Sequence, residues 1–147
     1  MNKTFIVSAL IILVLALGVI WYYSAPKENV SAESVKAEES NKTGYIDVTP
    51  EQASALIESN PELVIIDVSS SYELGHLPGA VNYMLGDGSL DRVIPTLDKN
   101  KEYLVYCHGD SASIAGAEKL VNAGFGKVYR LKGNYSAWVE LGLSVEI

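Results

Sequence analysis

Reactive side chains are scarce in this sequence of 147 residues, which contains one cysteine, Cys107, and two histidines. A single cysteine excludes an intramolecular disulfide and any zinc site built from several cysteines. With only His76 and His108 beside it, a four-ligand metal centre would also need carboxylates. We therefore expect neither a metal nor a cofactor in this protein.

Positive charge is also in short supply. The chain has 11 Lys and Arg residues against 18 Asp and Glu residues, a net charge of −7 and a pI near 4.7. An acidic chain is poorly suited to neutralise phosphates, so we expect no nucleic-acid partner. The hydrophobic fraction of 48% and the mean hydropathy of +0.15 argue against a disordered chain. The length fits one domain of ordinary size.

One long hydrophobic run accounts for the high mean hydropathy. From Phe5 to Tyr23 only Ser8 and Gly18 are not apolar, and no residue is charged. A helix needs roughly 20 such residues to cross a bilayer. The run ends in an aromatic cluster typical of a membrane interface, Trp21, Tyr22 and Tyr23. Residues 1–23 are therefore predicted to form a transmembrane anchor.

Two other interpretations of this run are disfavoured. A cleaved signal peptide is disfavoured because Tyr23 stands where a small residue is preferred and Pro26 follows the small pair Ser24-Ala25. A buried core helix is disfavoured because the run has no apolar-polar period. Lys3 before the run favours a cytoplasmic N-terminus. The sequence thus predicts a single-pass membrane protein whose domain lies outside the cytoplasm.

Beyond the hydrophobic run, the chain divides into a polar segment and a domain. Residues 24–43 are rich in Ser, Glu, Lys and Ala and lack aromatic residues, which predicts a flexible linker. Residues 44–147 are predicted to be the folded domain. They carry seven Lys or Arg residues against fourteen Asp or Glu residues, so the whole net charge belongs to this part.

Strand and helix patterns alternate along the predicted domain. Short apolar runs predict strands, and amphipathic segments with capping residues predict helices. Thr49-Pro50-Glu51-Gln52 has the pattern of a capping box with proline at the first helical position. Alternation of this kind indicates an α/β fold with a mainly parallel sheet covered on both faces. The predicted strands are 45–48, 63–68, 81–83, 103–106 and 127–131, and the predicted helices begin at Pro50, Leu90, Ser113 and Asn134.

Cys107 is the candidate nucleophile. It follows a predicted buried strand and precedes a loop, 108–112, that opens a predicted helix. Backbone N–H groups and a helix N-terminus at such a point stabilise a thiolate or a bound anion. The alternative is that Cys107 is a small buried hydrophobe, and its position does not decide between the two.

Several motifs then resemble the rhodanese homology family. Its signature is matched by Asp67-Val68, Tyr72-Glu73 and the run Gly75-His76-Leu77-Pro78-Gly79-Ala80. Tyr106-Cys107 resembles the family's strand and active-site cysteine, and the segment from Leu131 to Trp138 resembles its closing Leu-x-Gly-Gly-x-x-Ala-Trp motif. The resemblance implies a three-layer α/β fold with a five-stranded, mainly parallel sheet flanked by helices.

The resemblance also implies sulfurtransferase chemistry. The Cys107 thiolate would take a sulfane sulfur from a small donor, hold it as a persulfide and pass it to a thiophilic acceptor such as cyanide or a thiol. The residues implied in substrate binding are those of the loop after the cysteine: His108, Gly109, Asp110, Ser111, Ala112 and Ser113.

The loop departs from the family pattern in its charge. Ala112 stands where the family has an arginine, Ser69 where it often has another, and Asp110 where glycine is common. These departures predict weak activity toward thiosulfate or a different donor. Phosphatases of this fold carry an arginine where Ser113 stands, which disfavours phosphatase activity. An alternative function is a catalytically weak docking module that recruits a redox or sulfur-handling partner at the membrane.

The other polar residues of interest allow two interpretations each. His108 either contacts substrate or stabilises the thiolate as imidazolium, or it is an exposed loop residue. Asp67 and His76 are expected to support the turn and the loop packing rather than chemistry. Ser113 is either a hydrogen-bond donor to an anion or the N-cap of the helix that follows. Arg130 and Lys132 lie near the end of the last predicted strand and either supply the positive charge that the loop lacks or, as we expect, lie at the surface. We expect Trp138 in the core.

Overall fold

The computed structural model describes residues 44–147. The predicted membrane anchor, 1–23, and the predicted linker, 24–43, lie outside the described residues. Within the described part of the chain, no helix combines the length and the hydrophobicity that crossing a membrane requires.

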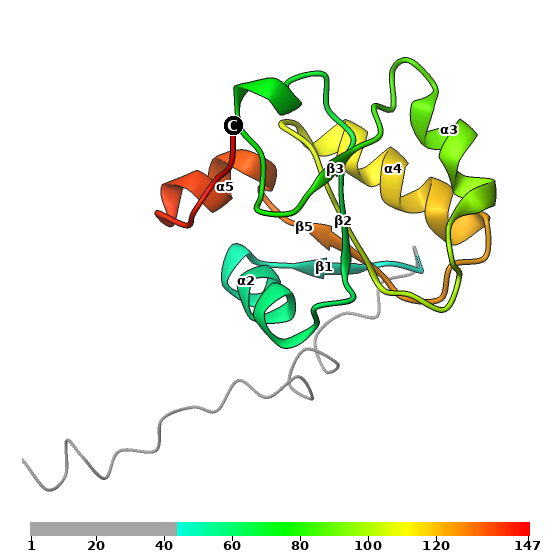
Figure 1. The fold of residues 1–147 in the computed structure, drawn as a ribbon, viewed down its shortest axis with the longest axis horizontal. Helices are drawn as coiled ribbons and strands as arrows, with labels where there is room; N and C mark the ends of the chain where they lie inside the picture. The colour runs from blue at the N-terminus through cyan, green and yellow to red at the C-terminus, as the bar shows by residue number, and fades with distance from the viewer. Residues whose placement is uncertain (1–43) are drawn as a thin grey trace, which may run out of the picture. The chain divides into compact units, whose positions relative to one another are not determined.

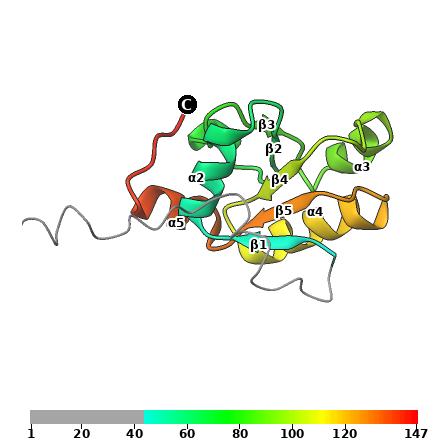
Figure 2. The ribbon, with the colours of Figure 1, turned by 90° about the horizontal axis from the view of Figure 1, so that it is seen from below.

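The domain is built on a five-stranded sheet in which every neighbouring pair of strands is parallel. The strand order is β1-β5-β4-β2-β3, and Figure 2 shows the five strands side by side in this order. The parallel five-stranded sheet expected from the sequence is therefore confirmed. The strands are β1 (Ile46–Val48), β2 (Val64–Asp67), β3 (Val81–Asn82), β4 (Tyr103–Tyr106) and β5 (Val128–Leu131).

Helices cover both faces of the sheet, which gives the three layers seen in Figure 1. One face packs against α2 and α5, and the other against α3 and α4. The helices are α2 (Pro50–Ser59), α3 (Ser89–Val93), α4 (Asp110–Asn122) and α5 (Asn134–Glu140), with short 3₁₀ turns at Tyr72–Leu74 and Ile94–Thr96.

Alternating side chains of the central strands supply the two halves of the core. Along β4, Leu104 packs toward α2 and α5, and Val105 packs toward α4; both are fully buried. All four residues of β4 are buried, as expected for a strand with neighbours on both sides and helices on both faces. Trp138 is buried against the same half as Leu104, which confirms its predicted core position.

The capping box at the start of α2 is confirmed. Thr49 Oγ1 accepts from the Gln52 N–H at 3.3 Å, and Gln52 Oε1 accepts from the Thr49 N–H at 2.9 Å. These two bonds satisfy backbone donors that have no partner within the helix.

The start of α4 was predicted wrongly. The helix begins at Asp110 rather than at Ser113, and Ser113 is not its N-cap. Ser113 is fully buried, and its hydroxyl donates to the Asp110 carbonyl at 3.0 Å. The earlier start has no sequence signal because Gly109, the N-cap residue, has no side chain to cap the helix.

The short helix predicted from Leu90 to Leu97, with an interruption at Pro95, is divided there in the structure. The α-helical part ends at Val93, and a 3₁₀ turn follows at Ile94–Thr96. Proline has no N–H for the α-helical bond and crowds the preceding turn, so the helix cannot continue regularly through it.

Candidate functional site

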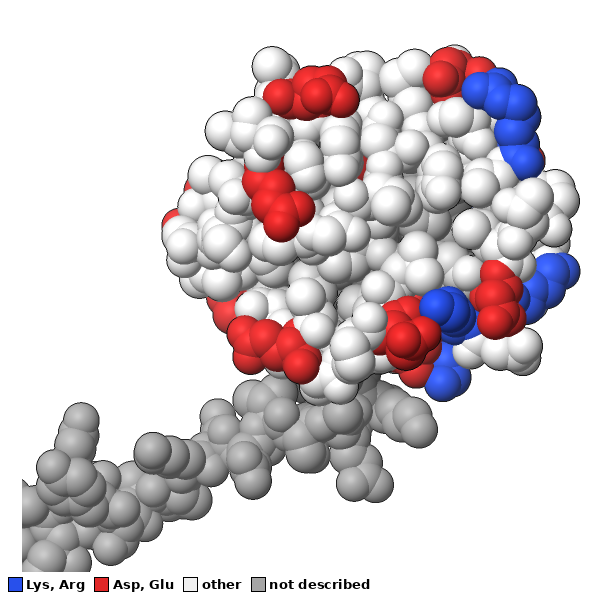
Figure 3. Space-filling view, viewed as in Figure 1, with Lys and Arg blue, Asp and Glu red and all other residues white. Residues whose placement is uncertain are grey.

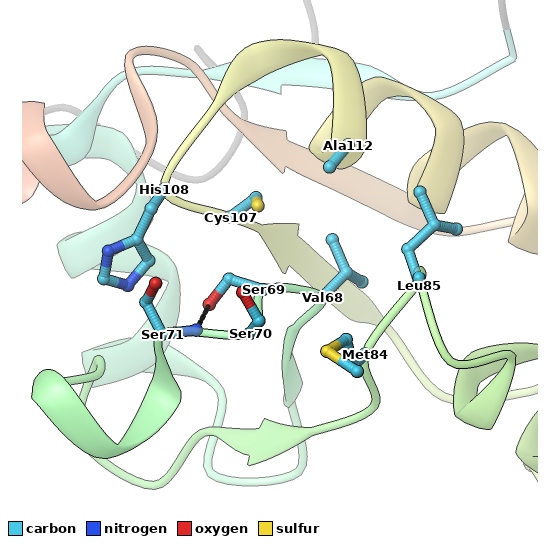
Figure 4. Close-up of a pocket in the computed structure, with 10 residues that line it drawn as sticks. Val68, Ser69, Ser70, Ser71, Met84, Leu85, Cys107, His108 and Ala112 are labelled. Carbon is cyan, nitrogen blue, oxygen red and sulfur yellow. Dashed lines mark hydrogen bonds between the residues drawn. The ribbon is translucent and has the colours of Figure 1, made fainter.

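A pocket of about 340 Å³ lies beside Cys107. It forms where the carboxyl ends of β2 and β4 meet at one edge of the parallel sheet, the usual place for a site in an open α/β fold. Figure 4 shows the side chains that line it. The lining residues are Val68, Ser69, Ser70, Ser71, Met84, Leu85, Gly86, Cys107, His108 and Ala112.

Cys107 is held firmly at this edge. Its side chain is buried, and the residue exposes only 6% of its surface. Its N–H donates to Asn134 Oδ1 at 3.1 Å, and its carbonyl accepts from the Tyr135 N–H at 3.0 Å. In Figure 4 the chain after His108 arches over Cys107 into α4, and the sulfur points toward Ala112. The thiol therefore lies under the first turn of a helix of 13 residues.

The turn between β5 and α5 positions Asn134. This residue has φ +57° and follows Gly133, which has φ +74°. The left-handed conformation disfavours most side chains, but asparagine tolerates it better than others. Asn134 was not predicted as a site residue, although the sequence contains a signal: Asn134 replaces the second glycine of the family's closing Leu-x-Gly-Gly motif.

Arg130 is buried, with 6% of its surface exposed, so its predicted surface position is wrong. It lies on β5 directly opposite Asp47 of β1 in the sheet register. Its Nε and Nη2 donate to the two carboxylate oxygens of Asp47 at 2.6 and 2.8 Å. These hydrogen bonds raise the pKa of Arg130. Lys132 is exposed, as predicted.

The carboxylate of Asp110 is held away from the pocket lining. Its Oδ1 accepts from Arg130 Nη1 at 3.1 Å and from Asn134 Nδ2 at 2.6 Å. Hydrogen bonds from a guanidinium, which Asp110 shares with Asp47, and from an amide thus stabilise the negative charge that the sequence places in the loop. Asp110, Gly109, Ser111 and Ser113 are not among the residues that line the pocket, whereas His108 and Ala112 are.

His108 lies at the other end of the pocket from the sulfur of Cys107 (Figure 4). Its ring stacks on Tyr135, with the ring centroids 4.3 Å apart and the planes 13° from parallel. Its Nε2 lies 3.8 Å from Oδ2 of Asp67, whose side chain is fully buried at the end of β2. The other Asp67 oxygen, Oδ1, accepts from the Ser69 N–H at 2.7 Å. Asp67 therefore both supports the turn after β2 and faces His108.

The second histidine, His76, lies outside the pocket lining. It is buried, and its ring stacks on the ring of Tyr72 with the two centroids 3.8 Å apart. Its Nε2 lies 3.6 Å from Oε2 of Glu146. Its backbone N–H and carbonyl bond to Glu146 in an isolated antiparallel bridge. These contacts fasten the C-terminal segment to the loop after β2.

Among the described residues that line the pocket, the imidazole of His108 is the one basic side chain. The guanidinium of Arg130 is paired with the carboxylates of Asp47 and Asp110. On the face seen in Figure 3, uncharged surface covers the middle, and Lys and Arg side chains are confined to one side. An anionic substrate in this pocket would depend on backbone N–H groups and hydroxyls rather than on a cation.

The fold and the cysteine site can be compared with known proteins. The rhodanese-like domain family matches residues 49–141. The thiosulfate sulfurtransferase GlpE of Pseudomonas syringae is 32% identical over 96 residues, which cover 65% of this chain and 89% of that protein. A rhodanese-like domain from Anabaena has a TM-score of 0.61 and 31% identity, over 68% of this chain and 77% of that one. The polysulfide-sulfur transferase of Wolinella succinogenes has a TM-score of 0.61 and 25% identity, and the match covers 71% of this chain and 80% of that one.

The Asp47–Arg130 pair leads to a stability prediction. Arg130→Met should lower the free energy of unfolding by about 2–3 kcal/mol, because it leaves two carboxylates without their shared buried partner. Lys127→Met is the matched control: its exposed pair with Glu102 should contribute less than about 1 kcal/mol. Urea denaturation of the wild type and both variants measures the free energy of unfolding of each. An equal decrease in both variants would contradict the role assigned to Arg130.

Proposed function

The chain belongs to the rhodanese-like domain family, and from this premise we propose that it is a sulfurtransferase that carries sulfane sulfur on Cys107. In the first step the Cys107 thiolate attacks the sulfane sulfur of a donor. A bond forms between the two sulfurs, and the donor's own bond to that sulfur breaks, with its electron pair leaving on the donor. For thiosulfate the leaving group is sulfite. The resulting persulfide then gives its outer sulfur to a thiophilic acceptor.

The position of Cys107 is the observation that carries this proposal. Its sulfur lies beside a pocket and under the first turn of α4. The first N–H groups of a helix have no partner within the helix, and the helix dipole adds partial positive charge there. Both favour a thiolate and an anionic persulfide at this point. The sulfurtransferase names of the relatives support the same chemistry.

A second candidate function follows from the absence of a Lys or Arg from the pocket lining formed by residues 44–147. Without a cation, the domain is poorly equipped for a small dianion, which favours a docking module that recruits a redox or sulfur-handling partner. Partner recovery by the wild-type chain and by Cys107→Ser distinguishes the two. Recovery that needs no thiol supports docking, and recovery lost with the thiol supports sulfur exchange.

The first prediction concerns sulfur loading. Incubation with thiosulfate or polysulfide should add the mass of one sulfur atom to the intact protein, and cyanide should remove it as thiocyanate. Because Cys107 is the single cysteine, Cys107→Ser should show neither change. Mass spectrometry and thiocyanate release measure the two steps. A wild-type protein that gains no sulfur from any donor would refute the sulfurtransferase proposal.

The second prediction concerns the donor. Ala112→Arg places a guanidinium in the pocket lining and should raise the loading rate from thiosulfate by about tenfold, as expected for one new charge-assisted contact. Ser111→Arg is the matched control, since it adds the same charge in the first turn of α4 but outside the pocket lining. Equal gains in both variants would mean that overall charge, and not the pocket, limits the use of thiosulfate.

The third prediction concerns location. We propose that the run from Phe5 to Tyr23 anchors the protein in a membrane with the domain outside the cytoplasm, on the support of its length and lack of charge. The full chain should sediment with membranes, and a chain starting at residue 44 should remain in the supernatant. Protease added to sealed cells should digest the domain. A full chain found in the soluble fraction would contradict the anchor.

A further inference from the structure

The carboxylate of Asp67 is a buried charge that the described part of the chain leaves incompletely paired. Its side chain exposes none of its surface, and its Oδ1 accepts from the Ser69 N–H at 2.7 Å. Its Oδ2 has no hydrogen-bond partner among the described residues. This oxygen lies 3.8 Å from Nε2 of His108, whose imidazole offsets the charge only when it is protonated. Because buried charges are ordinarily paired, a carboxylate at this point favours a positive charge nearby.

Exposed carboxylates also adjoin each segment that lines the pocket. Glu73 follows the lining residues after β2, Asp87 follows those after β3, and Asp110 lies between the lining residues of the loop and of α4. Asp87 is within 4.0 Å of the guanidinium of Arg92, so this carboxylate is offset. The other two add negative charge beside the pocket from two different elements.

Two tyrosines report this negative charge. Burial raises the pKa of Tyr72, which follows the serines of the pocket lining. The charges of Glu146, Glu73 and Asp67 raise this pKa further. Burial likewise raises the pKa of Tyr106, at the end of β4, and the charge of Asp67 adds to the effect. Carboxylates from separate parts of the chain therefore act together on the elements around the pocket.

Basic side chains of the described residues do not balance these charges. The guanidinium of Arg130 is shared by Asp47 and Asp110, so the three groups together keep one negative charge. Lys132 is exposed at the end of β5 and is not among the lining residues. On the face seen in Figure 3, Lys and Arg are confined to one side, whereas Asp and Glu appear on several sides of the uncharged middle. The surroundings of the pocket thus favour a cation over an anion.

We propose that the sulfur donor of this pocket is a small organic persulfide that carries a positive charge, and that thiosulfate is a poor substrate. The inference rests on the proposed sulfurtransferase function and adds the class of donor to it. Thiosulfate and polysulfide are anions, so a sulfane-sulfur donor with a positive charge needs an organic group to carry that charge. The pocket, of about 340 Å³, has room for such a group, and Val68, Met84 and Leu85 give it an apolar wall (Figure 4).

The loading step balances with this donor. The Cys107 thiolate attacks the outer sulfur of R–S–SH, where R carries an ammonium group. A bond forms between the Cys107 sulfur and the outer sulfur, the bond between the two donor sulfurs breaks, and its electron pair leaves on the inner sulfur as R–S⁻. The proton stays on the outer sulfur, so one thiolate is consumed, one is released, and no oxidant is needed. The ammonium group offsets the charge of the leaving thiolate, whereas sulfite has no cation to do so.

The first experiment measures the charge preference without any sulfur transfer. Cys107, the single cysteine, is reacted with two methanethiosulfonates, one with a trimethylammonioethyl chain and one with a sulfonatoethyl chain. Each reagent adds its chain as a disulfide and releases methanesulfinate, so the two differ in charge and not in chemistry. The measured quantity is the rate with the cation divided by the rate with the anion, relative to the same ratio for a free thiol. The reaction is run at about pH 8, where an ordinary imidazole is neutral.

We expect a corrected ratio of about ten for the wild type, the size of effect that unit charges near a site produce at an intermediate dielectric constant. Asp67→Asn should lower it about threefold, and this loss should persist at high salt because the carboxylate is buried. Glu73→Gln and Asp110→Asn should each lower it by a smaller factor that salt removes, since both carboxylates are exposed. Should Asp67→Asn fail to fold, these two variants decide alone.

Glu58→Gln is the matched control, because it removes the same charge from an exposed residue far from the pocket. Glu58 lies at the end of α2 that leads into the start of β2, which is the edge of the parallel sheet opposite to the pocket. Its ratio should equal that of the wild type. A wild-type ratio near one, or a fall in Glu58→Gln equal to that in Glu73→Gln and Asp110→Asn, overturns the charge preference of the pocket.

The second experiment compares two donors that differ in the same way, 2-aminoethyl persulfide and 2-sulfonatoethyl persulfide. Mass spectrometry follows the rate at which each adds one sulfur atom to the wild-type protein. The cationic donor should load Cys107 about tenfold faster, by the same electrostatic argument. Equal loading from both donors overturns the donor class while leaving sulfur transfer intact. A protein that gains no sulfur from either persulfide, from polysulfide or from thiosulfate overturns the sulfurtransferase function and the donor class together.

Discussion

The buried guanidinium of Arg130 is the constraint on which the geometry of the cysteine site depends. A charge in the interior must be paired, and Arg130 meets this requirement with both oxygens of Asp47 and one of Asp110. Asp110 in turn accepts from Asn134, whose other amide atom accepts from the Cys107 N–H. A continuous set of hydrogen bonds therefore joins β1, β5, the start of α4, the start of α5 and the backbone of Cys107.

This arrangement keeps the charged groups of Asp110 and Arg130 out of the pocket lining at the end of the sheet. Outside the pocket lining, the carboxylates of Asp110 and Asp47 share the guanidinium of Arg130, so the three groups together keep one negative charge. Within the lining, the thiol of Cys107 is left with the N-terminus of α4, three serines and an imidazole. A pocket without a fixed cation is a less favourable host for a dianion than for a thiol or a persulfide of low charge. The acidic net charge of the domain acts in the same direction at long range, where salt screens it.

Much of the fold and part of the site could be predicted from the sequence. Local sequence patterns predicted three features that are present in the tertiary structure: the capping box at Thr49, the buried strand from Tyr103 to Tyr106 and the inward-facing Trp138. Cys107 could be located because it directly follows that strand. The prediction failed at Ser113, because the first turn of α4 carries no capping side chain or apolar period. It failed at Arg130, because an arginine in a strand looks the same in sequence whether its partner is water or an aspartate across the sheet.

By itself, the sequence determined the class of fold and the position of Cys107 directly after a buried strand, because hydrophobic periodicity and short turn motifs act over a few neighbouring residues. Only the tertiary structure decided which charges reach the pocket. Asp47 and Arg130 are 83 residues apart in the chain and meet because their strands are register partners. Asp67 and His108 meet because parallel strands end at the same edge of the sheet. Electrostatic interactions act through space, and the folded sheet sets the distances between these groups.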